Sequence, residues 1–418
     1  MTTLATPPAL GPWWKEPTKD HCLAFAAAWF GWVLDAFDFT VFILVMGQIK
    51  SEFNVSSTYA TLSIALTLLL RLIGGMVAGW AADRWGRRLP LLISIVWFAV
   101  CDASIAFAHS FETILILRTL FGFGMGAEWT AGATLAMEQW PARSRGIASG
   151  VLQGSWAVGY FLAAIAAAYV VPVWGWRGLF ITAALPAVLI FPLMFFVKEP
   201  PHIAKQAADT KLDTSFMAIV RTPGVMSRIV WGSAAMAAGL AAYYGLIGNY
   251  PQLLTGFGHD IKGIAFHTAL FNVGMMAGAV ACGFIAMKRG VAPAILVPTL
   301  AMAVCVPLYV GASPELLAVG AFLGGLFGAG YSGTTPLLLT SLFPDHLRAK
   351  AVGIVYHVGA VPAAFVPMLI AAMHEKGGLG MGTSIGIVVA ISVLGLAGLV
   401  ALGPAEVKAR PSADAVAH

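Results

Sequence analysis

Charged residues are scarce in this chain, and their scarcity excludes most classes of protein at once. Asp, Glu, Lys and Arg make up 10% of the 418 residues, whereas 59% of the residues are hydrophobic. Soluble globular proteins carry about a quarter of their residues as these four types, because their surfaces face water. The chain is therefore not a water-soluble globule, and most of its surface must face lipid.

Cysteine pairs and enzyme motifs are also missing. The four cysteines, Cys22, Cys101, Cys282 and Cys305, stand singly, without CxxC or Cys/His spacing, so neither a disulfide framework nor a metal site is indicated. The absence of a Walker motif, a nucleophile elbow and an HExxH motif argues against an ATP-driven pump or a hydrolase. We expect no catalytic residue, no metal and no cofactor, and hence no enzyme.

The net charge of +5 does not indicate a nucleic-acid partner. Basic residues are scattered over short segments and are not clustered with stacking aromatics. With the N-terminus inside, most Lys and Arg residues fall in cytoplasmic loops, as the positive-inside rule requires. We therefore expect a multi-pass protein of the cell inner membrane with both termini in the cytoplasm.

The sequence contains about a dozen apolar runs of roughly 20 residues, a length that crosses a hydrocarbon core of about 30 Å as a helix. The ten-residue alternation of an outer-membrane barrel is absent. The predicted fold class is an all-α polytopic membrane protein with twelve transmembrane helices. They are expected at 21–46, 58–82, 89–108, 113–136, 147–170, 177–197, 227–254, 263–287, 291–311, 315–340, 350–374 and 381–403.

An internal repeat divides the chain. WPARSRGIASG at 140–150 reappears as FPDHLRAKAVG at 343–353. Together with the polar stretch 198–226, a predicted cytoplasmic linker, this indicates an N-terminal six-helix half (1–197) and a C-terminal six-helix half (227–418). Parallel repeats of this kind are a transporter architecture in which the substrate lies between the halves near the bilayer midplane.

Ionisable residues within the predicted helices of the first half are the strongest functional signal. They are Asp35, Asp38, Arg71, Asp102, Arg118 and Glu128. Each costs about 2.5 to more than 10 kcal/mol near the bilayer centre and persists only with a partner or a function. The repeat aligns Arg118 with Ala321 and Glu128 with Tyr331, so the scaffold itself does not need these charges. Asp102 lies towards the outer end of its helix, where we expect it to be hydrated and structural.

The charge pattern suggests roles for five of these residues. Asp35 and Asp38 share one helix face, so one of them should hold a proton unless a cation such as Arg71 lies close. Arg118 is the preferred anchor for a substrate carboxylate, with Arg71 as a second candidate. Glu128, about 15 Å from Arg118 along the helix axis, is a third candidate proton carrier beside the two aspartates. The alternative is that all five form structural ion pairs or packing networks.

Polar residues of the second half give a weaker signal. Tyr331, Asn272, Tyr243 and Asn249 could line the substrate cavity opposite these charges. Each could equally be a helix-contact residue whose hydrogen bonds are satisfied locally.

The segment GWAADRWGRR at 79–88 resembles the G-x-x-x-D-R-x-G-R-R signature of the major facilitator superfamily. The resemblance implies the fold of that superfamily and a cytoplasmic gate that switches conformation without recognising substrate. The gating residues would be Asp83, Arg84, Gly86, Arg87 and Arg88.

Five further segments resemble the sialate:proton symporter family, which contains sialic acid transporters and lactate/pyruvate permeases. They are LDAFDF (34–39), RLIGG (71–75), RTLFGFGMGAEW (118–129), EQWPARSRGIASG (138–150) and VVPVWGWRGLF (170–180). The resemblance implies inward movement of an organic acid together with protons.

We therefore expect a secondary transporter that works by alternating access as a monomer in the lipid bilayer. Its partners would be protons and a small organic anion, with a lactate- or pyruvate-like monocarboxylate favoured. A sialic or aromatic acid is the alternative, followed by a proton-driven drug exporter.

Overall fold

The computed structural model describes residues 12–199, 213, 215–311 and 314–409, and every regular element in these ranges is a helix. Nine helices in this described part of the chain are long and apolar enough to cross a membrane. Other membrane crossings do not meet these criteria as single helices, because two crossing segments are merged into one helix, the helix is interrupted, or it carries charged side chains. The predicted class, an all-α membrane protein with the twelve-helix architecture, is confirmed.

The first half of the chain folds into five long helices. They are α1 (Lys19–Glu52), α2 (Ser57–Trp85), α3 (Arg88–Ile105), α4 (Phe111–Gln139) and α5 (Arg145–Phe196). The two helices predicted at 147–170 and 177–197 are both contained in α5, where Gly175 has φ 64° and ψ −172° and separates two crossing segments. Only glycine adopts this conformation without steric cost, so the bend lies at the one residue between these segments that permits it.

The helix starts follow local capping chemistry. Thr18, Ser56, Ser110 and Asp260 each precede a long helix, and their side-chain oxygens accept a hydrogen bond from the backbone N–H three residues later. Each cap satisfies one of the N–H groups that have no partner within the helix.

The second half is built from nine helices joined by short irregular turns. They are α8 (Val225–Ile247), α9 (Tyr250–Gly256), α10 (Ile261–Arg289), α11 (Val291–Tyr309), α12 (Leu317–Leu323), α13 (Thr335–Ser341), α14 (Arg348–Ala363), α15 (Val366–Glu375) and α16 (Met381–Ala401). The linker contributes α7 (Phe216–Arg221), and α17 (Ala405–Lys408) follows α16. Residues 200–212 and 214 of the predicted linker lie outside the described residues.

Three helices predicted as continuous in the second half are interrupted, which corrects the prediction. The helix expected at 227–254 breaks between α8 and α9, where Pro251 begins the second piece. The helix expected at 350–374 breaks after Pro362. Between α12 and α13 the chain forms a π-helical segment (Gly324–Ala329) and a 3-10 segment (Gly330–Thr334). Apolar run length carries no information about such breaks, because a broken helix and a straight one need the same hydrophobic length.

The internal repeat is visible in the backbone. Gly86 ends α2 with φ 94° and Gly290 ends α10 with φ 93°. A Cβ added at Gly122 of α4 would lie 2.1 Å from the carbonyl oxygen of Thr67, and one added at the equivalent Gly325 would lie 1.9 Å from that of Phe271. Equivalent pairs of helices therefore cross by direct backbone contact in both halves.

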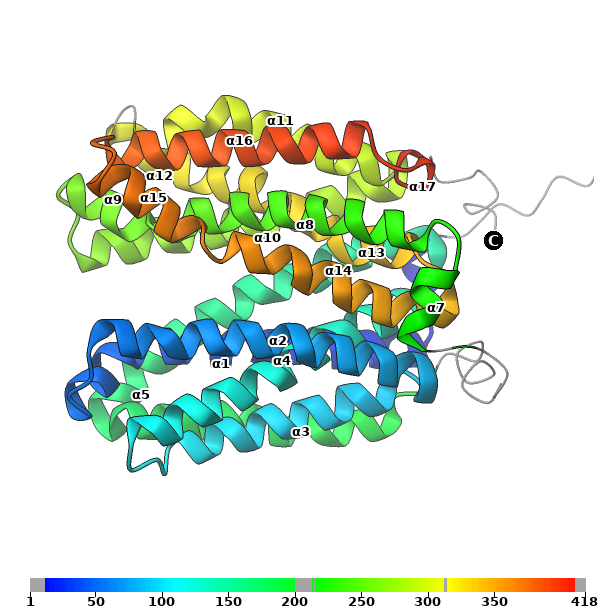
Figure 1. The fold of residues 1–418 in the computed structure, drawn as a ribbon, viewed down its shortest axis with the longest axis horizontal. Helices are drawn as coiled ribbons and strands as arrows, with labels where there is room; N and C mark the ends of the chain where they lie inside the picture. The colour runs from blue at the N-terminus through cyan, green and yellow to red at the C-terminus, as the bar shows by residue number, and fades with distance from the viewer. Residues whose placement is uncertain (1–11, 200–212, 214, 312–313, 410–418) are drawn as a thin grey trace, which may run out of the picture.

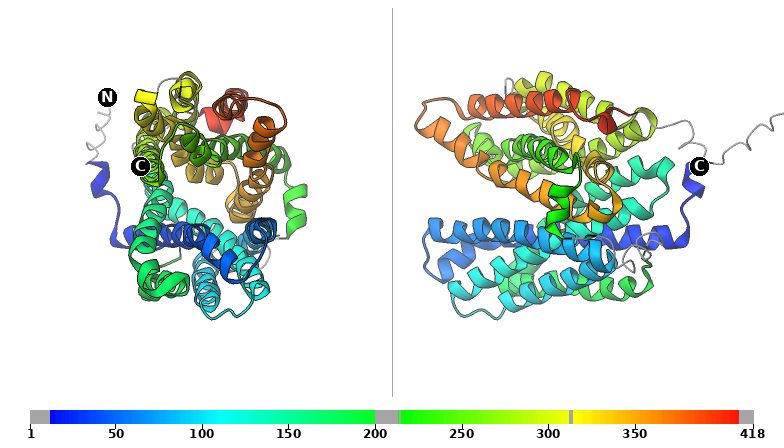
Figure 2. Two further views of the ribbon diagram at one scale, coloured as in Figure 1. Left: turned by 90° about the vertical axis from the view of Figure 1, so that its left-hand side faces the viewer. Right: turned by 45° about the vertical axis from the view of Figure 1, so that its right-hand side comes forward.

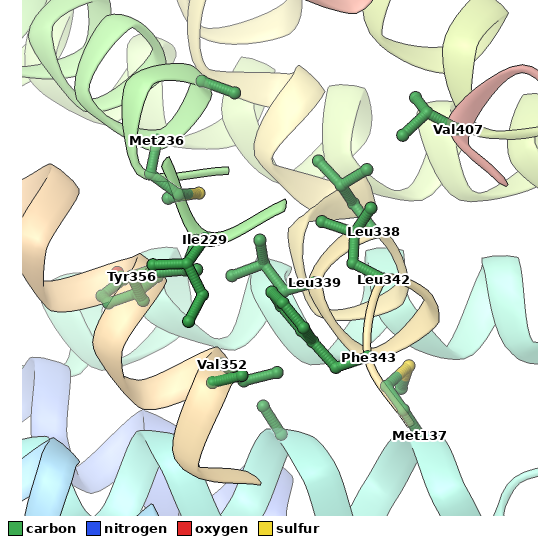
Figure 3. Packing of buried hydrophobic residues seen from close by; sticks show 14 of the residues in the cluster. Met137, Ile229, Met236, Leu338, Leu339, Leu342, Phe343, Val352, Tyr356 and Val407 are labelled. Atoms are coloured by element: carbon green, nitrogen blue, oxygen red, sulfur yellow. The ribbon is translucent and has the colours of Figure 1, made fainter. Parts of the chain in front are cut away.

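The helices form two groups that lie side by side, with α1–α5 in one and α8–α16 in the other (Figures 1 and 2). At the end of the bundle that carries α7, a buried apolar cluster joins the two groups. Met137 of α4 packs there with Leu342 and Phe343, which follow α13, and with Val352 of α14 (Figure 3). We call this end of the molecule the linker face and the opposite end the far face.

Candidate functional site

A small cavity lies between the two halves at mid-depth. Its lining includes Arg71 of α2, Trp32 of α1 and Trp156 of α5 from the first half, and Tyr243 of α8 and Tyr356 of α14 from the second. Its volume is about 40 Å³. Sites for organic ligands usually measure about 300–1,000 Å³, so this conformation has no room for an organic acid. In this structure the halves are in contact from the linker face up to this cavity.

Arg71 is the charged residue in the lining of this cavity. Its Nη2 lies 3.7 Å from Oδ2 of Asp35 on α1, too far for a hydrogen bond, and neither its Nε nor its Nη2 has a hydrogen-bond partner. Nε and Nη2 lie on one edge of the guanidinium, the edge that can bind a carboxylate through two parallel bonds. The sequence-predicted pair of Arg71 with an aspartate is therefore present, and the bidentate edge of Arg71 is left unsaturated.

Aromatic rings surround this guanidinium. The Cζ atom of Arg71 lies 5.7 Å from the ring centre of Trp32 and 5.6 Å from that of Tyr356. Tyr356 in turn stacks on Trp129 of α4, with ring centres 3.8 Å apart. Trp156 donates a hydrogen bond of 3.1 Å to the hydroxyl of Tyr243 across the two halves. Flat π surfaces thus enclose a single positive charge.

Glu128, a predicted proton carrier, is buried at the crossing of α4 with α1. A Cβ added at Gly31 of α1 would lie 2.4 Å from its Oε1, so the crossing has space for the carboxyl group only because residue 31 is glycine. Its Oε2 has no hydrogen-bond partner, and Glu128 interacts electrostatically with Asp35 and Arg71. Glu128 is therefore a neighbour of the Arg71–Asp35 pair, placed inside the first half.

The remaining predicted charges form a separate cluster deeper in the first half. Arg118 donates from Nη1 to Oδ1 of Asp102 on α3 at 3.3 Å, and Asp38 interacts electrostatically with both residues. Arg118 is 1% exposed and lies outside the lining of the central cavity. The expectation that Asp102 is hydrated is wrong, because its exposure is 0%. The depth of a residue along a helix does not reveal the direction in which its side chain points.

The predicted polar residues of the second half occupy different places. Tyr331 and Tyr243 line the central cavity, and Tyr243 also borders a second chamber of about 90 Å³ on its far-face side. Asn272 lines that chamber and donates to the carbonyl of Thr268 in its own helix. Asn249 lies at the break between α8 and α9 and donates to the carbonyl of Pro367 at 2.8 Å. In the described part of the chain, no three His, Cys, Asp or Glu side chains are grouped to hold a metal ion.

A polar network at the linker face joins the two halves. Asp83 of α2 accepts hydrogen bonds from the backbone N–H groups of Ala349 and Lys350 at 3.1 and 3.0 Å, at the first turn of α14. Arg87 lies 3.2 Å from Asp83 and 2.9 Å from Glu138 of α4. A buried carboxylate thus caps the positive end of a helix from the other half.

Glu138 extends this network across the molecule. Its Oε1 accepts from Arg348 at 3.0 Å, while Arg87 also donates to the backbone carbonyl of Asp345. Sequence reasoning did not assign a role to Glu138. The repeat could have indicated one, because Glu138 aligns with Ser341 and therefore carries a charge that the other half does without.

The other predicted gating residues lie around this network. Gly86 has φ 94°, and a Cβ there would lie 2.7 Å from the carboxyl carbon of Glu199, so the turn requires glycine. Glu199 accepts hydrogen bonds from the backbone N–H groups of Arg87 and Arg88 at 2.5 and 2.9 Å. Arg88 also donates to the carbonyl of Phe195. Arg84 is exposed.

Comparison with known proteins agrees with this geometry. The model of the Major Facilitator Superfamily matches residues 28–285. The chain is 30% identical over 374 residues to the cis,cis-muconate transport protein of Acinetobacter baylyi, covering 86% of this chain and 89% of that protein. It is 28% identical to the sialic acid transporter NanX of Escherichia coli, covering 91% of this chain and 94% of that protein.

A solved structure shares the fold. The proton:xylose symporter XylE, bound to 6-bromo-6-deoxy-D-glucose, superposes with a TM-score of 0.78 at 19% sequence identity, covering 94% of this chain and 96% of that one. The relatives and the fold are those of multi-pass membrane transporters and not of enzymes. With its all-helical fold, its central cavity and its network at the linker face, the chain belongs to the Major Facilitator Superfamily.

Proposed function

We propose that this protein is a secondary active transporter that carries an organic carboxylate inward together with protons by alternating access. The observation that carries the proposal is the Arg71–Asp35 pair in the central cavity, with the bidentate edge of Arg71 unsaturated. A substrate carboxylate that takes this edge forms two charge-assisted hydrogen bonds and displaces Asp35.

Proton coupling follows from this competition. Asp35 is 0% exposed and loses its cation when the substrate arrives, so its carboxyl group takes up a proton to avoid being a buried, unpaired charge. The cavity then holds one arginine, one substrate carboxylate and a neutral Asp35. For a monocarboxylate such as benzoate, the two halves can then move past each other without carrying net charge through lipid. Glu128, which interacts with both members of the pair, is the second candidate carrier.

The aromatic lining favours a planar, unsaturated or aromatic carboxylate. Trp32 and Tyr356 present flat faces to the guanidinium and Trp156 lines the same cavity, and such faces stack on conjugated substrates. The muconate transport protein among the relatives supports this choice. The sequence favoured a lactate-like monocarboxylate, which has no ring or diene to stack, and we therefore place the aromatic-acid alternative first.

The orientation that we propose places the linker face in the cytoplasm of a cell whose inner membrane contains the protein. The hydrogen bonds that join the two halves lie between the linker face and Trp156, which is at mid-depth. We propose that the two halves are the predicted units 1–197 and 227–418, joined by the linker 198–226. We propose that the protein works as a monomer, because the cavity lies within one chain.

Uptake into proteoliposomes tests the proposal. We expect labelled benzoate or cis,cis-muconate to accumulate under an inward proton gradient without ATP, with lactate, pyruvate and sialic acid as weaker competitors. Uptake that is unchanged when the gradient is collapsed, or that requires sodium, would refute proton symport. Preferential transport of lactate would refute the assignment of an aromatic substrate. The Arg71→Gln variant is the matched negative control, because glutamine is a polar side chain that lacks the anchoring charge.

A further inference from the structure

One hydroxyl group of the first half bonds to the backbone of a helix in the second half. Ser149 of α5 is 0% exposed, and its Oγ donates to the backbone carbonyl of Gly333 at 2.6 Å. The same oxygen accepts from the backbone N–H of Leu337 at 3.1 Å. Gly333 and Leu337 are four residues apart, the spacing of the two partners in an α-helical hydrogen bond. Ser149 therefore bridges two groups that would pair with each other in a regular helix.

The first turn of α13 explains why this hydroxyl is needed. An N-cap side chain accepts from the N–H of the second or third residue of its helix. The second residue of α13 is Pro336, which has no N–H, so the group to be capped is the N–H of Leu337. Thr334, which precedes α13, does not cap it, because its hydroxyl donates to the carbonyl of Tyr331 at 2.8 Å. Ser149 is therefore the N-cap of α13, supplied by the other half.

The internal repeat shows that the scaffold does not require this arrangement. The repeat aligns the irregular residues 324–334 with residues 121–131, which lie inside the single helix α4. It aligns Ser149 with Val352 of α14, whose side chain neither donates nor accepts hydrogen bonds. The irregular backbone and the hydroxyl that caps it are therefore both missing from the equivalent contact.

The capped segment carries two side chains of the central cavity. Tyr331 and Ser332 line this cavity, and Gly333 follows them directly. The Oγ of Ser332 is buried and has no hydrogen-bond partner. Ser149 lies one helical turn from Gln153, which lines the same cavity from α5. Ser149 thus holds the backbone beside the cavity without lining the cavity itself.

We propose that Ser149 is a positioning residue of the substrate site. Its hydroxyl caps α13 and fixes the segment Gly330–Thr334, so Tyr331 and Ser332 are held in place only while the halves are in contact on the linker-face side of the cavity. When the linker face opens, Ser149 withdraws from α13, the segment loosens and the affinity for the carboxylate falls, which favours release on that side. The inference rests on the proposed function, because it assigns a residue that controls affinity at the same site.

Hydrogen exchange measured by mass spectrometry tests the cap without any substrate. Peptides that contain Leu337 should exchange about 2- to 30-fold faster in Ser149→Ala than in wild type, the range expected for the loss of an N-cap side chain. The matched control is Ser155→Ala. Ser155 of α5 is also 0% exposed, but its hydroxyl donates to the carbonyl of Leu152 in its own helix at 2.6 Å. Equal exchange of these peptides in Ser149→Ala and Ser155→Ala would overturn the proposal.

A second variant covers the case in which Ser149→Ala does not fold. Ser149→Cys keeps a side chain of similar shape, but its thiol is a weak donor and a weak acceptor. Faster exchange than in wild type would then support the cap, and wild-type exchange would refute it. These data remain informative even if none of the carboxylates tested is transported, so the failure of this inference and that of the proposed function are distinguishable.

Substrate binding tests whether Ser149 acts through the capped segment. In calorimetry with benzoate, Ser149→Ala should weaken binding about threefold to tenfold, although Ser149 does not line the cavity. In the background Tyr331→Phe/Ser332→Ala, the same substitution should change the Kd by less than about twofold, because the polar groups that Ser149 positions are then missing. Unchanged affinity in Ser149→Ala, or equal weakening in both backgrounds, would overturn the proposal.

Discussion

Replacing Asp83 by asparagine tests the gate at the linker face. The carboxylate of Asp83 accepts from two backbone N–H groups of α14 and pairs with Arg87, all out of contact with water. Asparagine keeps one acceptor oxygen and places an NH₂ group where the second oxygen was. One charge-assisted hydrogen bond between the halves is therefore lost, and a donor faces a donor.

The structure allows the size of this effect to be worked out. Hydrogen bonds to charged groups contribute about 1.5–3 kcal/mol, which corresponds to about a 10- to 150-fold change in an equilibrium constant. The lost bond exists only while the linker face is closed. Asp83→Asn should therefore shift the population by about this factor towards the state in which the linker face is open.

Spin-label distances across the linker face measure this shift. Labels at Arg84→Cys and Met226→Cys, both exposed positions on different halves, report the separation once the four native cysteines have been replaced by alanine. Asp83→Asn should enlarge the long-distance population and slow net transport, while substrate affinity changes little because the cavity at Arg71 is untouched.

Asp213→Asn is the matched control for this experiment. Asp213 is an exposed linker carboxylate that accepts from the backbone N–H of Ser215 at 2.9 Å, and the hydrogen bonds from Ser215 hold the pKa of Asp213 below its usual value. The Asp213→Asn substitution, like Asp83→Asn, removes one negative charge, but this charge lies in the linker and its loss breaks no hydrogen bond between the two halves. An Asp83→Asn distance distribution equal to that of Asp213→Asn would refute the gating account.

Three further outcomes follow from the geometry. Gly150→Ala should disfavour closure of the linker face and reduce transport, because its Cβ would lie 2.3 Å from the carbonyl oxygen of Ala279 across the halves. The control is Gly154→Ala, whose Cβ would meet only a side-chain atom at 3.6 Å and which should transport normally. Equal transport rates for the two variants would contradict the argument. Trp156→Phe removes the hydrogen bond to Tyr243 and should weaken substrate binding about threefold to tenfold, as measured by calorimetry, whereas unchanged binding would exclude Trp156 from the site. Because binding takes up a proton, the apparent Kd for the substrate should rise about tenfold per pH unit over the pH range in which Asp35 is ionised in the free protein and protonated in the substrate complex, and a Kd independent of pH in that range would contradict coupling at the cavity.

The extent of sequence-based prediction differs between the fold and the site. Apolar run length predicted the helices because lipid imposes one length on every crossing segment. The π-helical segment Gly324–Ala329 could not be predicted, since it arises from packing against neighbouring helices and leaves the hydrophobic length unchanged.

The same limit applies to the buried charges. The buried charges could be identified from the sequence because an ionisable side chain in a membrane helix has a high free-energy cost. The sequence also indicated Arg71 as a cation beside the aspartates of α1. It favoured Arg118 over Arg71 as the substrate anchor, whereas Arg71 is the arginine that lines the central cavity. Which arginine lines the cavity is decided by the rotation and packing of the helices, and a single sequence does not reveal either.

Proton uptake on substrate binding tests the central claim most directly. Detergent-solubilised protein in weak buffer is mixed with benzoate or cis,cis-muconate, and the change in pH and the heat of binding are recorded together. The account predicts about one proton taken up per substrate bound in the wild type, binding without proton uptake in Asp35→Asn, and loss of binding by about 2–5 kcal/mol in Arg71→Gln. Wild-type binding without proton uptake, or full uptake by Asp35→Asn, would contradict it.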